Sequence, residues 1–131
     1  MPQKPIELIL IRQLASHLCI PMFVVDANGT MLFYNEPAEA LLGRRFDEAG
    51  EMKLETWSTI FMPTDEQGNA LPPEALPLFV ALRERRPVHR TIQFTRLDGV
   101  SKMVEITAFP LVGQSGRQLG AAATFWSVES V

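Results

Sequence analysis

The chain has 131 residues, 47% of them hydrophobic and 21% charged, a balance that supports one folded domain with a core and excludes a disordered chain. Twelve basic and fifteen acidic residues give a net charge of −3, which argues against direct binding of nucleic acid. The single cysteine, Cys19, excludes a disulfide framework and a cysteine-rich zinc site. No apolar run approaches the roughly 18–20 residues that cross a bilayer. The apolar residues 6–11 do not resemble a signal peptide, because they include Glu7 and lack a basic region before them. We therefore expect one cytoplasmic domain with no membrane partner.

The first predicted element is a helix that starts near Pro5 and ends before Pro21. Its apolar residues cover more than the single stripe that a surface helix needs. They are Ile6, Leu8, Ile9, Leu10, Ile11, Leu14, Ala15 and Leu18. The excess predicts a homodimer in which this helix meets its copy, so we divide the chain into a dimerisation helix, 1–19, and a domain, 20–131. The residues that we expect in the dimer interface are Ile6, Ile9, Leu10 and Leu14.

A β-hairpin followed by a capped helix is predicted next. Residues 22–25 and 30–34 form two β-prone runs, joined by Asp26-Ala27-Asn28-Gly29, in which Asn-Gly supplies the positive φ angles of a tight hairpin. Asn35 then ends the second strand and can cap a helix, with Pro37 just inside it. Strand, turn, strand and capped helix thus follow from local residue chemistry.

The middle of the chain is predicted to be helical and the last third to be β. Four large apolar residues at helical spacing indicate a short helix; they are Leu54, Trp57, Ile60 and Phe61. A longer helix is expected to open at 71–74 and to end at Pro87. Alternation predicts strands over 88–97, 100–111 and 118–128, and their short connections make them antiparallel neighbours. The result is an α+β domain with helices on one face of an antiparallel sheet.

This order of segments resembles a PAS domain from about Leu14 to Ser130. The resemblance rests on the hairpin at 26–29, Tyr34–Gly43, Leu71–Glu74 with Pro77-Leu78, Ala81–Pro87, Arg96–Gly99, Phe109–Leu111 and Gly120. It implies a five-stranded antiparallel sheet in which the two N-terminal strands lie beside the last one. It also implies a sensory or protein-interaction domain of a bacterial-type signalling or transcription-regulatory system, with an effector or partner signalling protein. The family's frequent Asp-Ile-Thr run is replaced by Ser127-Val128-Glu129, which fits both a part of a longer protein and a stand-alone domain.

Members of this family hold haem, flavin or a small metabolite between sheet and helices, or hold nothing. The light-sensing flavin subclass needs a cysteine in a Gly-x-Asn-Cys-Arg-like motif, and 57–63 contains none, while Cys19 is expected to be a small buried residue. Haem needs an axial ligand, and the helix over 73–86 has no histidine. We expect His17 at a surface or interface and His89 on the exposed side of a strand. Flavin and haem are both disfavoured, and a haem-based sensor is the weakest alternative.

A small organic ligand is harder to exclude. We expect Val104, Ile106 and Ala108 to face the core, with Ala122 and Thr124 on the same face of the next strand. The three alanines at 121–123 then leave room for a ligand, or for the nearby aromatic side chains to fill the same space. The candidate pocket residues are Trp57, Phe61, Phe79, Val104, Ile106, Ala122 and Thr124.

Catalytic and metal sites are not recognisable in the sequence. It contains no Gly-rich phosphate loop, no Ser/His/Asp set that can be placed and no HExxH motif. We therefore predict no enzyme and no metal protein, but either a ligand-binding sensor or a ligand-free homodimerisation module. The fold itself is tested by one pairing: residues 22–26 should lie beside residues 119–127.

Overall fold

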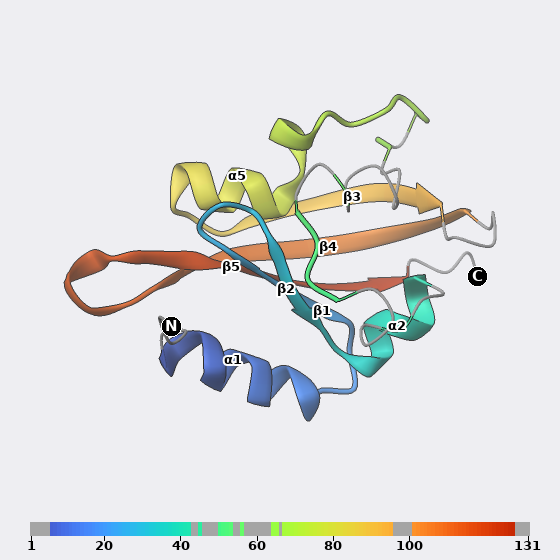
Figure 1. The fold of residues 1–131 in the computed structure, drawn as a ribbon. Coiled ribbons are helices and arrows are strands. Elements are labelled where there is room, and N and C mark those ends of the chain that lie inside the picture. Colours follow the sequence, from blue (N-terminus) through green and yellow to red (C-terminus); the bar gives the residue numbers. More distant parts are fainter. Residues whose placement is uncertain are drawn as a thin grey trace.

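The structure, a computed structural model, describes residues 6–42, 45, 50–53, 56, 64–65, 67–95 and 101–127. Five antiparallel strands form one sheet in the order β2-β1-β5-β4-β3. They are β1 (Met22–Asp26), β2 (Met31–Tyr34), β3 (Val88–Thr95), β4 (Ser101–Val112) and β5 (Gln118–Ser127). The described helices are α1 (Ile6–Ser16), α2 (Glu36–Leu42), η1 (Pro73–Ala75), α5 (Pro77–Glu84) and η2 (Gln114–Gly116). Figure 1 shows α5 and α1 on opposite sides of the sheet.

The predicted pairing of the first strand with the last is confirmed. β1 lies antiparallel to β5, with Met22 opposite Thr124 and Asp26 opposite Gly120. The chain therefore places β1 beside the central strand β5, which follows nearly a hundred residues later, and leaves β2 at the edge of the sheet. This placement of β1 and β5 puts the end of α1 next to the centre of the sheet.

The turn between β1 and β2 differs from the predicted tight hairpin. Gly29 has a φ of +85°, whereas Asn28 does not adopt a positive φ. The carbonyl of Asp26 accepts a hydrogen bond from the Gly29 N–H at 3.0 Å, and the Asp26 carboxylate accepts bonds from the N–H groups of Asn28 and Thr30. The side chain of Asp26 thus stabilises a longer turn in which only one residue needs the left-handed conformation.

The helix expected to open at 71–74 begins later, at Pro77. Leu76 is extended, with φ −69° and ψ 139°, and η1 forms a separate short turn before it. A proline lacks an N–H and disfavours a helical conformation in the residue before it, so the longer helix cannot run through Pro77. α5 ends at Glu84, and the capping residue Arg85 follows in the left-handed region with a φ of 54°. The N–H of Arg85 donates to the Ala81 carbonyl at 2.9 Å.

Two apolar clusters lie on the two faces of the sheet. The inner cluster packs the sheet against α2 and α5 and contains Phe23, Val25, Met31, Tyr34, Ala38, Met52, Leu76, Leu78, Ala81, Ile92, Val104, Ile106, Ala108, Ala121, Ala123 and Phe125. The outer cluster packs the sheet against α1 and contains Leu8, Ala15, Met22, Val24, Leu32, Leu119 and Ala122. Within the described part of the chain, no helix is long and apolar enough to cross a membrane. Both sheet faces therefore carry apolar side chains, which is why the domain has a helix on each side.

Candidate functional site

The inner face of the sheet is the surface expected to line a ligand pocket. Residues paired directly across antiparallel strands point to the same face, so Ile106 opposite Phe125 and Ala108 opposite Ala123 define that face. Val104 and Ile106 are buried in the inner cluster, as predicted. The rings of Phe23 and Phe125 pack edge to face, with centroids 4.8 Å apart. The part of the inner face around Phe23 and Phe125 is therefore filled by aromatic side chains.

The prediction that Ala122 and Thr124 share the inner face is wrong. Ala122 lies opposite Val24 and belongs to the outer cluster, beneath α1. Thr124 lies opposite Met22, another residue of the outer cluster. Because side chains alternate along a strand, the pairing of Ala108 with Ala123 puts the even-numbered residues of this part of β5 outside. The small residues of the inner face are instead Ala108, Ala121 and Ala123, each fully buried.

The three aromatic candidates divide into two groups. Trp57 and Phe61 lie outside the described residues. Phe79, on α5, is half-buried and packs against the inner cluster. The structure thus brings Phe79, Val104 and Ile106 together on one side of the sheet and separates them from Ala122 and Thr124.

The dimer candidates on α1 all lie on its solvent side. Leu8 and Ala15 bury one side of the helix against the sheet. Four large side chains remain exposed: Ile6 by 65%, Ile9 by 45%, Leu10 by 54% and Leu14 by 51%. Ile6, Leu10 and Leu14 follow one another at four-residue spacing, so they form a single row along the helix.

Asn35 is a connecting residue that the sequence indicated only as a helix cap. Its side chain is 2% exposed. Its carbonyl oxygen accepts hydrogen bonds from the N–H groups of Met22 at 3.0 Å and Ala38 at 3.2 Å. Its amide nitrogen donates to the carbonyls of Ala15 at 2.8 Å and Ile20 at 2.9 Å. One side chain therefore joins α1, the segment after it, β1 and α2, and only the cap could be inferred from local sequence.

Cys19 and His17 lie in the segment that leaves α1. The expected burial of Cys19 is wrong, because its side chain is exposed. The chain turns at the surface here, between the end of α1 and the first buried residue of β1. His17 is exposed, as expected for a surface or interface residue.

His89 lies on the outer face of β3, and its expected exposure is confirmed. Its Nδ1 lies 2.8 Å from the hydroxyl of Thr107, and its Nε2 lies 3.5 Å from a carboxylate oxygen of Glu105. The indole N–H of Trp126 donates to the other oxygen of Glu105 at 3.1 Å. These exposed side chains link β3, β4 and β5. Among the described residues, no group of three or more His, Cys, Asp or Glu side chains is arranged to hold a metal ion.

Among the residues that the structure describes, two carboxyl groups have clearly shifted pKa values, and local hydrogen bonds explain both. The pKa of Asp65 is lowered, chiefly because the Asn69 N–H donates to its carboxylate, with a further bond from the Gln67 N–H. The pKa of Glu84 is lowered by the hydrogen bond from Arg86. A lowered pKa favours the charged form, so each contact stabilises the fold at neutral pH and is lost as acid protonates the carboxylate. The two lowered pKa values therefore result from local hydrogen bonds in the turn at 65–69 and at the end of α5.

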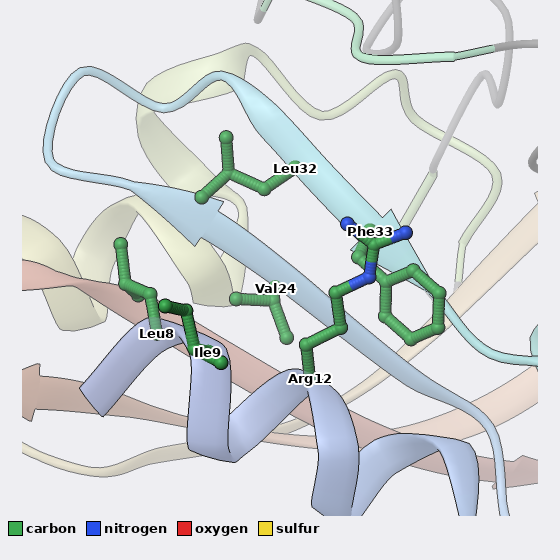
Figure 2. A pocket seen from close by; sticks show the side chains of 6 residues that line it. All are labelled: Leu8, Ile9, Arg12, Val24, Leu32 and Phe33. Atoms are coloured by element: carbon green, nitrogen blue, oxygen red, sulfur yellow. The ribbon is translucent and has the colours of Figure 1, made fainter. Parts of the chain in front are cut away.

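A groove lies between α1 and the edge strand β2. Figure 2 shows the side chains that line it: Leu8, Ile9 and Arg12 from α1, Val24 from β1, and Leu32 and Phe33 from β2. Its volume is about 160 Å³. The guanidinium carbon of Arg12 lies 4.6 Å from the centre of the Phe33 ring, an arrangement that attracts the cation to the ring face.

Comparison with known proteins identifies the class to which this fold belongs. A sequence profile of the PAS domain matches residues 20–126, and the chain belongs to the PAS domain family. As a member of this family, it is a domain of the sensory signalling class. A search of curated protein sequences finds no match.

Solved structures with the same fold come from several bacteria. The PAS domain of a protein from Colwellia psychrerythraea has a TM-score of 0.65 and 15% identity, covering 92% of this chain and 96% of its own. The PAS domain of nitrogen regulation protein NR(II) from Vibrio parahaemolyticus has a TM-score of 0.65 and 19% identity, covering 91% and 98%. The Rhodobacter sphaeroides LOV protein has a TM-score of 0.74 and 12% identity, covering 95% and 69%. At these identities the likeness concerns the fold.

Proposed function

We propose that this chain is a sensory and protein-interaction domain that acts as a homodimer. In this proposal residues 1–19 are the dimerisation segment and residues 20–131 are the PAS domain. The observation that carries it is the apolar solvent side of α1, with four large side chains 45–65% exposed. Contiguous exposed apolar patches of this kind mark interaction surfaces.

The energetics favour a second copy as the partner of α1. Burying about three additional Leu or Ile side chains per chain contributes roughly 5–9 kcal/mol before the entropy of association is subtracted. A twofold arrangement buries the row formed by Ile6, Leu10 and Leu14 on both chains, so the exposed apolar side of each α1 is covered by the other. Counted over the two chains, the contribution is about 10–18 kcal/mol, which exceeds the roughly 8 kcal/mol net of a micromolar dimer and leaves the remainder to offset the entropy of association.

Substituting Leu10 by glutamate is expected to convert the dimer into a monomer. The charge would enter the centre of the row formed by Ile6, Leu10 and Leu14, where it would lose its hydration. Sedimentation equilibrium of the wild type and the variant measures the change. The matched control is Val112→Glu, because Val112 on β4 is as exposed as Leu14, both at 51%. Monomeric wild type at about 100 µM would contradict the proposal.

A second function, binding of a small organic ligand between the inner sheet face and the helices, is favoured by the alanines of that face. Ala108, Ala121 and Ala123 are fully buried on neighbouring strands β4 and β5, and an alanine side chain occupies less space than any larger apolar side chain would at these positions. In this proposal Phe79, Trp57 and Phe61 close the pocket, with Val104 and Ile106 on its floor. If no ligand binds, the same aromatic side chains fill the space.

Substituting Ala123 by leucine is expected to separate the two cases. If the space is open, the added methyl groups expel the ligand with little loss of stability. If the space is packed, the variant loses about 1–3 kcal/mol of unfolding free energy from overpacking. Native mass spectrometry and an absorption spectrum above about 350 nm detect a retained molecule, and urea unfolding measures the stability. A wild-type mass equal to that of the bare chain would contradict ligand binding.

The output of the domain is proposed to be the regulation of an effector, either a kinase or a transcription regulator. The support is the likeness to PAS domains of nitrogen regulation protein NR(II) and of a two-component sensor histidine kinase. A cytoplasmic location is part of this proposal, since an exposed thiol at Cys19 persists in a reducing compartment. The partner would then be a signalling protein joined to, or bound by, the dimer.

A further inference from the structure

A pocket lies between the start of α1 and the turn that joins β4 to β5, two parts of the chain that Figure 1 shows close together. Its volume is about 280 Å³, and it is lined by Ile6, Glu7, Gly113, Gln114, Arg117 and Leu119. We propose that this pocket binds a free α-amino acid with a small aliphatic side chain. The pocket lies on the α1 side of the sheet, so it is separate from the ligand space proposed at the inner face, and it does not depend on the homodimer.

Two charged side chains of opposite sign line the pocket. Glu7 is half-buried in the first turn of α1, and Arg117 is exposed just before β5. Among the residues that the structure describes, neither side chain forms an ion pair. A half-buried carboxylate loses part of its hydration, and here no counter-charge replaces it. An amino acid would supply both partners, because its ammonium group can bind Glu7 and its carboxylate can bind the guanidinium of Arg117.

Gly113 leaves the space beside Glu7 open. A Cβ atom at this position would lie 3.2 Å from Oε2 of Glu7 and 3.0 Å from Cδ1 of Leu119. Both distances are shorter than ordinary van der Waals contact, so a side chain here would press on the carboxylate and on the apolar wall. The φ of Gly113 is −93°, which residues with a side chain adopt without strain. The missing side chain therefore contributes space to the pocket rather than backbone freedom.

The turn holds the backbone of Arg117 in place beside the pocket. The N–H of Gly113 donates to the carbonyl of Arg117 at 2.8 Å, and the N–H of Arg117 donates to the carbonyl of Gln114 at 3.2 Å. Ser115 and Gly116 have φ angles of 60° and 72°, as the two central residues of a tight hairpin turn require. Because these bonds fix the main chain before a ligand arrives, binding through Arg117 requires little ordering of the turn.

The size and the apolar wall of the pocket favour an aliphatic amino acid. Leu119 is 5% exposed and Ile6 is 65% exposed, so the wall reaches from the outer cluster to the surface. The volume is below the roughly 300–1,000 Å³ of sites for drug-sized ligands and about twice that of a cavity that holds benzene. The pocket therefore matches a molecule of the size of valine or leucine, with its charged groups between Glu7 and Arg117.

An NMR titration of the full chain with L-leucine tests the site. We expect a dissociation constant of about 1 mM for the wild type, with amide shifts that change at the start of α1 and in the β4–β5 turn. Glu7→Gln and Arg117→Gln should each raise this constant at least tenfold, because each removes one charge-assisted contact. The matched control is Arg83→Gln, which removes an exposed arginine of α5 on the opposite side of the sheet and should leave binding unchanged.

Two analogues of leucine test the two charges separately. The α-hydroxy acid analogue has no ammonium group, and isopentylamine has no carboxylate. The wild type should bind each analogue at least tenfold more weakly than leucine. Glu7→Gln should not weaken binding of the hydroxy acid further, because the contact that this variant removes is already absent. Equal affinity of the wild type for leucine and for either analogue would overturn the proposal.

The outcomes separate this pocket from the inner face of the sheet. Leucine binding that is lost in Ala123→Leu but kept in Glu7→Gln and Arg117→Gln would place the ligand at the inner face and overturn the assignment. Unchanged amide shifts in the wild type at about 10 mM leucine would also overturn it, while the proposed homodimer would not be affected. A ligand that joins α1 to the turn should slow amide hydrogen exchange in α1, and unchanged exchange at saturating leucine would contradict the site.

Discussion

Replacing Asn35 by alanine is expected to lower the free energy of unfolding by about 3–5 kcal/mol. The substitution removes all four hydrogen bonds of the buried side chain. Each such bond contributes about 1 kcal/mol net, and a buried donor or acceptor left without a partner costs about 1–3 kcal/mol. Loss of the helix cap at α2 is included in this total. Urea unfolding followed by fluorescence measures the change, and a loss below about 1 kcal/mol would show that water replaces the amide.

Asn35→Asp is the informative companion to this variant. The carboxylate still accepts from the N–H groups of Met22 and Ala38, so the α2 cap is kept. It cannot donate to the carbonyls of Ala15 and Ile20, so the tie to α1 is lost. Relative to the wild type, we expect Asn35→Asp to accelerate amide hydrogen exchange in α1 more than in α2. Asn35→Ala is expected to accelerate exchange in both helices. Equal effects of Asn35→Asp on the two helices would contradict the assignment of separate roles to the two side-chain atoms.

The features that could be predicted from the sequence are those that depend on neighbouring residues. Alternating apolar residues indicated the strands, and the apolar residues of α1 covered more than the single stripe that one packing contact needs. Asn35 was recognised as a cap because a cap is a contact between residues three apart. The PAS resemblance then supplied the strand order, in particular the pairing of β1 with β5, which the structure confirms.

The errors concern properties that depend on distant parts of the chain. Ala122 and Thr124 were placed on the wrong face because the inward direction of β5 is set by its register with β4, and a bulge between Leu111 and Val112 shifts that register. The exposure of Cys19 depends on where the end of α1 lies on the sheet. Three of the four hydrogen bonds of Asn35 reach 13 to 20 residues back along the chain. The register of β5, the exposure of Cys19 and these three hydrogen bonds all depend on residues far apart in the sequence, so no local sequence pattern predicts them.

The register of β1 against β5 also makes a prediction at Gly120, which lies opposite Asp26. A Cβ atom at this position would collide with the backbone carbonyl oxygen of Val25 and lie only 3.0 Å from the Cα of Asp26. Gly120 also has a φ of +157°, which L residues with a side chain rarely adopt. Backbone atoms cannot turn aside as a flexible side chain can, so β1 and β5 would have to separate.

Gly120→Ala is therefore expected to cost about 3–5 kcal/mol of unfolding free energy, at the upper end for a single substitution. The matched control is Gly116→Ala in η2, because Gly116 has a φ of +72° and no heavy atom within 4 Å of the added Cβ. That control carries the left-handed strain alone, which costs about 1–2 kcal/mol. Urea unfolding of both variants measures the difference, and equal losses would show that the close approach of the two strands is not the cause.

Separation of β1 from β5 would also disturb both apolar clusters, since Ala121 and Ala123 face the inner one and Ala122 the outer one. Because α1 packs on β1 and β5, the variant is also expected to weaken the homodimer proposed above.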